Sequence, residues 1–219
     1  MKLSNRLEVI LSYIKPCEVL FDVGADHGLL SIEAARRNLA KEVYAIENAK
    51  GPYDRLVQNI AKSGLKERVR AIYGSGLEID DDRKKSVVIA GLGTDKIVDI
   101  VKKAYYLDSL DYLIVDSHTN LKTLREEVTK FNFYILDECV LQEAKIYYEI
   151  ILFAKGNKRY DELDMTYGPI NLKKRSDIFL KKLQERVDEI DHILVKIGDE
   201  DNKKSNALIE EKERILNIL

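Results

Sequence analysis

Apolar and polar positions follow two different periods along the first 154 residues of the chain. Short runs rich in β-branched and aromatic residues predict strands, and the stretches between them repeat apolar residues every three or four positions, as an amphipathic helix does. In one such stretch, residues 51–64, Pro52 suits a helix start and Gly64 a helix stop. Strands that alternate with helices predict a parallel sheet with helices on both faces. The predicted strands are residues 19–23, 43–47, 69–73, 86–91, 112–117, 133–143 and 146–154.

The last two predicted strands follow each other without a helical stretch between them. We therefore expect them to pair as an antiparallel hairpin. Five parallel strands that end in such a hairpin make a seven-stranded α/β sheet, doubly wound and Rossmann-like, of the kind typical of class I methyltransferases. A plain Rossmann dehydrogenase would continue with further βα units.

The pattern changes after residue 157, which divides the chain into a main domain, 1–157, and a C-terminal region, 158–219. In this region apolar residues line one helix face, the acidic stretch 198–202 interrupts the pattern, and a second helix follows. Two helices joined by a short turn predict an antiparallel coiled-coil hairpin, which is too narrow to fold well alone and should dock on the main domain or a partner. The expected apolar positions are Leu172, Phe179, Leu183, Val187, Ile190, Leu194, Ile197, Leu208, Ile215 and Leu219.

Composition narrows the class of protein further. Of the 219 residues, 45% are hydrophobic and 34% charged, which is typical of a globular protein. No run of 18 apolar residues and no signal-peptide core occurs, so we expect no membrane association and a cytoplasmic location. Cys17 and Cys139 lie far from any metal-ligand spacing, so neither a metal site nor a disulfide framework is expected.

The net charge of −2 neither favours nor excludes a nucleic-acid partner, because phosphate binding depends on where the cations lie. Here the cations cluster. Residues 155–159 and 172–182 are basic, whereas 78–82, an expected solvated loop, and 198–201 are acidic.

The first strand runs into a turn with unusual chemistry, "DVGADHG". Asp22 and Asp26 lie beside only two glycines, Gly24 and Gly28, whereas a pyrophosphate needs three glycines and repels carboxylates. A cationic ligand without phosphate fits this turn better, and S-adenosylmethionine has both a sulfonium and an ammonium group. Taken alone, each residue also has a plainer explanation: a turn glycine, a capping aspartate, or in His27 a structural hydrogen-bonding group.

The carboxyl ends of the other parallel strands should meet this turn, because ligands of open α/β sheets bind at that edge. Glu47 follows the second strand, where an acid can bind both ribose hydroxyls. Glycines after the third and fourth strands would let the backbone approach an adenine ring and the methyl acceptor. The full set of predicted cofactor-binding residues is Asp22, Gly24, Asp26, His27, Glu47, Asn48, Gly74, Ser75, Gly76, Ala90, Gly91 and Leu92.

Several motifs occur in a familiar order: "LSNRL", "DVGADHGLL", "GPYDRLVQNI", "GSGL", "IAGLG", "LREEV" and "YGPINLKKRSDIF". Together they resemble the bacterial tRNA (adenine-22-N1)-methyltransferase family over nearly the whole chain. The resemblance implies S-adenosylmethionine as methyl donor and N1 of an adenine in the tRNA D-arm region as acceptor. The sequence departs from the family in three places: Ser75 replaces an acid, Thr94 replaces a glycine and is expected to narrow the entry for adenine, and Asp116, Ser117 and His118 replace Q-P-N.

In this interpretation the neutral adenine N1 attacks the methyl group directly, and no strong base is needed. Asp26 or the Gly91 carbonyl would orient the acceptor amine, and His27 or His118 would take up a later proton. The tRNA backbone would lie on Arg6, Lys122, Arg125, Lys173, Lys174 and Arg175.

Three other functions compete with this one. A small-molecule or protein methyltransferase could use the same fold, because fold does not fix the acceptor. A non-catalytic RNA-binding relative would also carry the motifs. An NAD-dependent oxidoreductase is disfavoured by the missing third glycine. The chain is expected to be a monomer or a weak homodimer.

Overall fold

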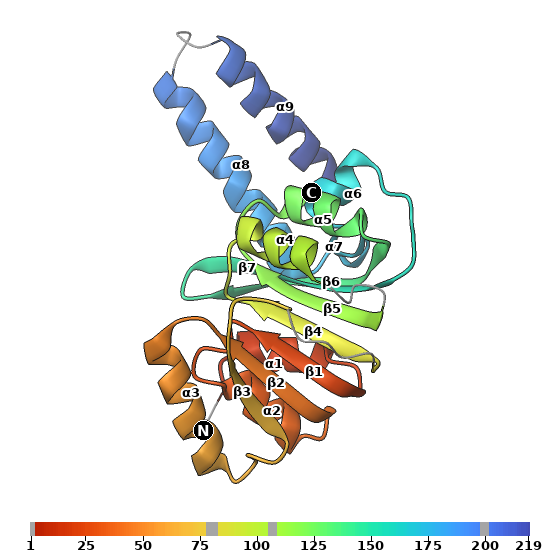
Figure 1. Ribbon diagram of the computed structural model, residues 1–219. Helices are drawn as coiled ribbons and strands as arrows, with labels where there is room; N and C mark the ends of the chain where they lie inside the picture. Colours follow the sequence, from red (N-terminus) through yellow and green to blue (C-terminus); the bar gives the residue numbers. More distant parts are fainter. Residues whose placement is uncertain (1–2, 78–82, 105–108, 198–201) are drawn as a thin grey trace.

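The computed structural model describes residues 3–77, 83–104, 109–197 and 202–219, and its centre is one seven-stranded sheet (Figure 1). The strand order is β3-β2-β1-β4-β5-β7-β6, with β1 to β5 parallel and β7 antiparallel to both neighbours. This is the order of a Rossmann-like methyltransferase sheet, and it confirms the predicted fold. The strands are β1 Cys17–Val23, β2 Ala40–Glu47, β3 Val69–Tyr73, β4 Lys85–Ala90, β5 Leu110–Ser117, β6 Phe133–Glu143 and β7 Ile146–Lys155.

Helices cover both faces of the sheet because successive strand residues point to opposite sides. Leu20 of β1 packs with the helices of one face, and Val19 and Phe21 pack with those of the other. The first face carries α1 (Asn5–Tyr13), α2 (Leu29–Arg36) and α3 (Lys50–Ser63), and the second carries α4 (Thr94–Lys103) and α5 (Leu121–Thr129). Two buried cores therefore enclose the sheet.

The predicted hairpin of the last two strands is present. A two-residue turn at Ala144 and Lys145 joins β6 to β7, and both residues have positive φ, 48° and 68°. Two consecutive left-handed residues are the geometry of a type I′ turn, whose twist matches that of paired strands. The stop of α3 is also as predicted, with Gly64 at φ 74° as its C-cap.

The C-terminal region contains four helices: α6 Glu162–Tyr167, α7 Pro169–Lys174, α8 Asp177–Ile197 and α9 Asn202–Ile218. Helices α8 and α9 form the predicted hairpin and project from the body of the protein (Figure 1). The expectation of one continuous helix from Leu172 onward is wrong, because Arg175 adopts a left-handed φ of 47° and separates α7 from α8. Leu172 consequently belongs to the short helix α7.

A separate apolar core holds the hairpin together and joins it to the sheet. Phe179, Leu183, Val187 and Ile190 of α8 are buried with Ile215 and Ile218 of α9, and Val140 of β6 belongs to the same cluster. The expected contribution of Leu219 is wrong: this residue lies beyond the end of α9 and is 38% exposed, and Ile218 is buried instead. The domain boundary at residues 157 and 158 stays a prediction.

The acidic segments 78–82 and 198–201 lie outside the described residues. Within the described ranges, no helix is both long and apolar enough to cross a membrane. In the same part of the chain, no group of three or more His, Cys, Asp or Glu side chains is placed to hold a metal ion.

Candidate functional site

Asp22 lies at the carboxyl end of β1 and is almost fully buried, with 2% of its surface exposed. Its Oδ2 accepts a hydrogen bond of 2.5 Å from the Ser31 hydroxyl of α2. Burial raises the pKa of Asp22 to about 6, the Ser31 hydrogen bonds oppose this shift, and the nearby charge of Glu47 adds to it. Among the described residues no cation pairs with this carboxylate, so a cationic ligand would stabilise its negative charge.

Glu47 ends β2 and is fixed by backbone amides on both sides. Its Oε2 accepts from the Asp26 amide at 3.1 Å, and its Oε1 accepts from the Ala49 amide at 2.8 Å. These bonds connect the turn after β1 to the turn after β2. The Glu47 carboxylate thus has a fixed orientation although it lies at the carboxyl end of β2.

The turn between β1 and α2 is built from residues with positive φ: Gly24 at 80°, Asp26 at 47° and Gly28 at 73°. The amides of Gly24 and Ala25 both donate to the Ile46 carbonyl, at 2.9 and 3.0 Å, which holds the turn against β2. Gly28 needs no role in ligand binding to explain it: its φ is positive, and a Cβ at this position would overlap the Leu56 side chain.

A cavity of about 720 Å³ opens where the ends of β1 to β4 meet. Every residue predicted to bind the cofactor borders it, from Asp22 and Glu47 to Ser75 and Leu92. The Cβ side of Gly91, which has a φ of 73°, faces open space within 4 Å. The structure therefore brings the predicted set together, and the role of each residue stays a prediction.

One wall of the cavity escaped prediction. Lys96, Asp99 and Lys103 of α4 border it, as does Leu7 of α1. Strand ends are recognisable in a sequence, but the helix face that turns toward them depends on packing. A weak signal existed at Lys96, Asp99 and Lys103, which recur every three or four residues along one face of α4.

Arg6 lies at the end of the cavity formed by α1 and is held by several groups. Its Nη1 donates to Asp116 Oδ2 at 2.9 Å, and its guanidinium lies over the Tyr148 ring at 4.5 Å. Burial raises the pKa of Asp116, while the charge of Arg6 and the Gly91 amide oppose the shift. The ring of His118 contacts Tyr148 edge-on, with centroids 5.4 Å apart.

The predicted catalytic residues separate into two groups. Asp26, His27 and Gly91 border the cavity, and His27 Nε2 lies 3.5 Å from Asp26 Oδ2. His118 is exposed and is not part of the cavity wall. The catalytic roles of all four residues stay predictions.

The expectation that Thr94 narrows the site is wrong. Its side chain is 2% exposed, and its hydroxyl donates to the Thr119 carbonyl in the loop after β5. Thr94 does not border the cavity, whereas Ser75 does. The threonine at position 94 is thus buried against the loop after β5 and does not reach the cavity.

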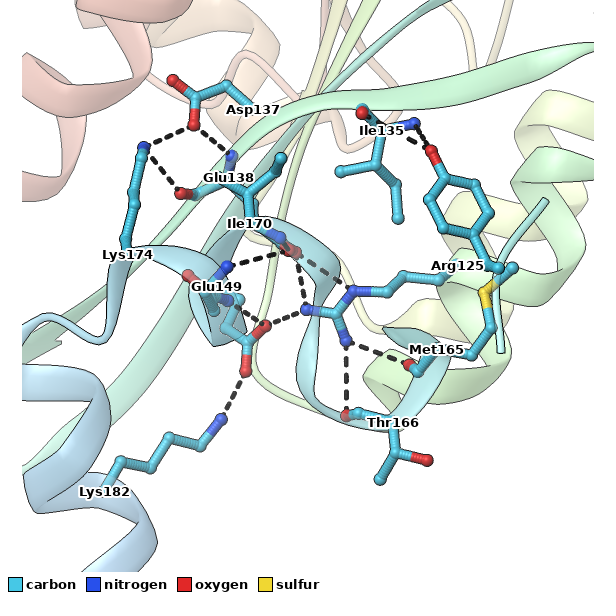
Figure 2. Close-up of polar contacts among 12 residues, drawn as sticks. Arg125, Ile135, Asp137, Glu138, Glu149, Met165, Thr166, Ile170, Lys174 and Lys182 are labelled. Atoms are coloured by element: carbon cyan, nitrogen blue, oxygen red, sulfur yellow. Dashed lines mark hydrogen bonds and ion pairs between the residues drawn. The ribbon is translucent and has the colours of Figure 1, made fainter. Parts of the chain in front are cut away.

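The predicted RNA contact at Arg125 is also wrong. Figure 2 shows its guanidinium between two buried carboxylates, those of Glu138 and Glu149. The Arg125 side chain has 0% exposure, so no RNA phosphate can reach it.

Arg6, also predicted to contact RNA, borders the cavity, and the remaining predicted RNA contacts lie on the surface. Lys122 is paired with Glu162 at 3.2 Å, and Lys174 donates to Asp137 Oδ1 at 2.5 Å. Arg175 is exposed and donates to the backbone carbonyls of Ile218 and Leu219 at the end of α9. Lys173 is exposed. Of these cations, Lys173 and Lys122 are the least committed to the fold, because surface ion pairs contribute little.

The side chains that border the cavity fit S-adenosylmethionine. Asp22, Asp26 and Glu47 supply carboxylates for a cationic group and a ribose, and two carboxylates stand in the turn where a phosphate ligand would need amides and glycines. The buried Asp22 carboxylate is the observation that most directly favours a cation.

Comparison with known proteins agrees with this chemistry. The sequence profile described as tRNA (adenine(22)-N(1))-methyltransferase matches residues 20–217. The Bacillus subtilis (strain 168) protein of that description is 28% identical over 214 residues, which are 94% of this chain and 90% of the relative. A Streptococcus pneumoniae crystal structure in complex with S-adenosyl-L-methionine superimposes with a TM-score of 0.90 at 28% identity and full coverage of both chains. M. capricolum TrmK in complex with S-adenosyl-homocysteine gives 0.85 at 26% identity, covering 100% of this chain and 96% of the other.

Proposed function

Because this chain belongs to the tRNA (adenine(22)-N(1))-methyltransferase family, we propose that the cavity at the strand ends is its active site. The enzyme transfers a methyl group from S-adenosylmethionine to N1 of an adenine in tRNA. The observation that carries the proposed placement is the convergence of Asp22, Asp26 and Glu47 on one cavity. Calorimetric titration of the protein with S-adenosylmethionine tests whether the donor binds. A weaker affinity in Glu47→Ala would place the donor in this cavity.

Each end of the cavity has its own proposed role. Glu47 holds the ribose hydroxyls of the donor, and Gly74 to Gly76 let the donor's adenine approach the backbone. Asp22 and Asp26 supply the negative charge that faces the cationic centre. The acceptor adenine enters beside Arg6, Leu7 and Gly91, at the opposite wall.

S-adenosylmethionine supplies an electrophilic methyl group on its sulfonium. The protein's part is to position the acceptor, because neutral adenine already carries a lone pair on N1 and needs no base. Gly91 leaves open space beside its Cα for the approaching acceptor adenine. The Gly91 carbonyl or the Asp26 carboxylate accepts a hydrogen bond from the exocyclic amine of that adenine. A carboxylate there also stabilises the positive charge that the ring acquires.

The Asp22 carboxyl predicts a pH dependence for donor binding. Its pKa of about 6 means that the group is mostly protonated at pH 5 and ionised at pH 7.5. Because the cationic donor favours the ionised form, its affinity is expected to fall about tenfold at pH 5, one unit below the pKa. Calorimetry across this pH range measures the effect. Asp22→Asn should remove the pH dependence and Asp111→Asn, on β5, should keep it; an unchanged profile in Asp22→Asn would refute the assignment.

The tRNA would lie across the C-terminal hairpin and the adjoining surfaces of α5, which carries Lys122, and α7, which carries Lys173. Lys173 is exposed and the side chain of the half-buried Lys122 is 40% exposed, so both can contact phosphates without disturbing the fold. The double variant Lys122→Ala, Lys173→Ala is expected to raise the KM for tRNA by about 3- to 10-fold, because each lost phosphate contact weakens binding. It should also flatten the salt dependence of the affinity by about one unit of slope per lost contact.

A matched control uses two exposed lysines at the opposite edge of the sheet, in the variant Lys41→Ala, Lys66→Ala. Equal salt slopes in both double variants would exclude a phosphate contact at Lys122 and Lys173. We further propose a cytoplasmic location, where tRNA is modified, and a monomer or weak homodimer in solution.

A further inference from the structure

A buried group of charges lies where the hairpin meets the sheet, and we call Arg125, Glu138, Glu149 and Lys182 the joint cluster. Arg125 of α5 donates to Glu138 Oε2 of β6 at 2.8 and 3.1 Å and to Glu149 Oε2 of β7. Lys182, in α8, donates to Glu149 Oε1 at 2.5 Å (Figure 2). Four elements therefore meet in one chain of ion pairs, and its three central side chains are at most 2% exposed.

The short helices α6 and α7 are fastened to the same cluster. Arg125 Nη1 donates to the carbonyls of Met165 and Thr166 at 3.3 and 3.5 Å, and Glu138 Oε1 accepts from the Ile170 amide at 2.8 Å. Between them Gly168 has a φ of 90°, and a Cβ at this position would overlap the Glu138 carboxylate. The segment that leads from the sheet to the hairpin is thus tied down along its length.

The hairpin itself is held along its length. Arg186 of α8 makes a bidentate pair with Glu211 of α9, at 2.7 and 3.0 Å, and Lys212 of α9 pairs with Asp191 of α8. At the root, Arg175 donates to the last carbonyls of α9. Contacts at the root and along both helices hold α8 and α9 together as one unit, and the joint cluster connects this unit to the sheet.

Stability alone does not explain such a cluster. Well-packed apolar side chains usually stabilise a core as much as a buried ion pair does, because burying charges costs desolvation. An ion pair adds direction, since an arginine fork accepts carboxylates only in particular orientations. The joint cluster therefore adds a directional contact between α8 and the sheet, beside the apolar contacts that Val140 shares with α8.

We propose that the joint cluster positions the tRNA: it holds the hairpin at one angle to the cavity, so that RNA lying on the hairpin presents its adenine to the active site. The proposal rests on the proposed function of the hairpin as an RNA-binding surface. Glu149 and Lys182 are then positioning residues that never touch the RNA base. Their effect falls on the productive alignment of the complex and leaves donor binding unchanged.

The test compares two neighbouring lysines of α8, Lys182→Met and Lys181→Met. Lys181 is exposed, pairs with Glu185 on its own helix and donates to Gln142 Oε1 of β6 at 3.2 Å on the surface, outside the joint cluster. Both variants therefore remove one lysine charge that links α8 to the sheet, and they differ in whether that lysine reaches the buried cluster. On full-length tRNA, Lys182→Met is expected to lower kcat/KM about 10- to 100-fold, because small misplacements of a substrate are that costly. Lys181→Met should stay within about twofold of the unaltered enzyme, and the Kd for S-adenosylmethionine should not change in either variant.

A distance measurement tests the angle without any RNA. Spin labels at Val195→Cys on α8 and Lys62→Cys on α3, both exposed, report the hairpin direction once Cys17 and Cys139 are replaced by alanine. Lys182→Met should broaden the distance distribution and Lys181→Met should leave it narrow. If Lys182→Met is too unstable to measure, Glu149→Gln can replace it. This variant keeps the shape of the side chain and should also broaden the distance distribution.

The two measurements separate the possible failures. An unaltered distance distribution in both Lys182→Met and Glu149→Gln overturns the proposal, as does an equal loss of kcat/KM in the Lys181 and Lys182 variants. Broadening in the Lys182 variant with full activity on tRNA shows a flexible hairpin that has no role in alignment, and also overturns it. Absence of tRNA methylation by the unaltered protein would instead count against the proposed function.

Discussion

Replacing Glu47 by alanine is expected to weaken S-adenosylmethionine binding by about 10- to 100-fold, because a charge-assisted contact to the ribose is worth about 1.5–3 kcal/mol. The carboxylate is held by the amides of Asp26 and Ala49, so its direction is set before any ligand arrives. The same substitution releases the two turns from each other, which adds to the loss. Calorimetric titration of the variant gives the Kd directly.

The matched control is Glu42→Ala on the same strand. Glu42 pairs with Arg83 at 3.3 Å on the surface and does not border the cavity. Its replacement should leave the Kd for S-adenosylmethionine unchanged. Equal affinities in the Glu47 and Glu42 variants would mean that the ribose lies elsewhere.

Replacing Arg125 by methionine is expected to lower the free energy of unfolding by about 3–5 kcal/mol, the usual loss when one partner of a buried ion pair is removed. Although burial raises the pKa of Glu149, the charges of Arg125 and Lys182 hold it below its ordinary value, so the group is ionised in the native protein. Without Arg125, the carboxylates of Glu138 and Glu149 face each other, and Lys182 is the remaining cation of the joint cluster. Urea denaturation at neutral pH measures the loss.

The pH dependence of this loss has a definite sign. In Arg125→Met the pKa of Glu149 should rise above its unfolded value, and the pKa of Glu138, which burial already raises, should rise further. The variant therefore recovers stability as the pH falls and the carboxyls take up protons. Lys122→Met on the same helix, a surface position, should change stability by less than about 1 kcal/mol. A loss of that small size in Arg125→Met would show that the joint cluster does not stabilise the native state.

The central strands β1, β4 and β5 were predictable because their apolar runs are buried on both faces of the sheet. The strand starts were less predictable: β1 begins at Cys17 and β2 at Ala40, whereas apolar runs predicted 19 and 43. In both strands the early residues are partly polar and exposed, such as Glu18 and Lys41, and only the pairing of β1 with β2 brings them into the sheet.

The candidate site was predictable to the extent that strand ends are. Asp22, Glu47 and Gly91 each follow an apolar run directly, and parallel strands bring such positions to one edge. Lys96 and Lys103 could not be placed in the same way. Their position at the cavity follows from how α4 is rotated against the sheet, which depends on the burial of Ile97 and Val101.

Arg125 shows how a local signal was overlooked. It lies four residues after Leu121 and three before Val128, on the face of α5 that packs inward. Glu138 and Glu149 lie beside apolar residues in two adjacent strands, and acids that are buried in such positions need a cation. One arginine on an apolar helix face and two acids in core strands together predict an ion pair, which charge clustering along the chain does not reveal.

Mass spectrometry of nucleosides tests the central claim most directly. Unmodified tRNA is incubated with the protein and S-adenosylmethionine that carries a deuterated methyl group, and the nucleosides are then separated and weighed. We predict deuterated N1-methyladenosine, arising from a single adenine of the D-arm region, and its loss in Glu47→Ala. Label on a different atom or base, or no label in tRNA at all, would contradict the assignment.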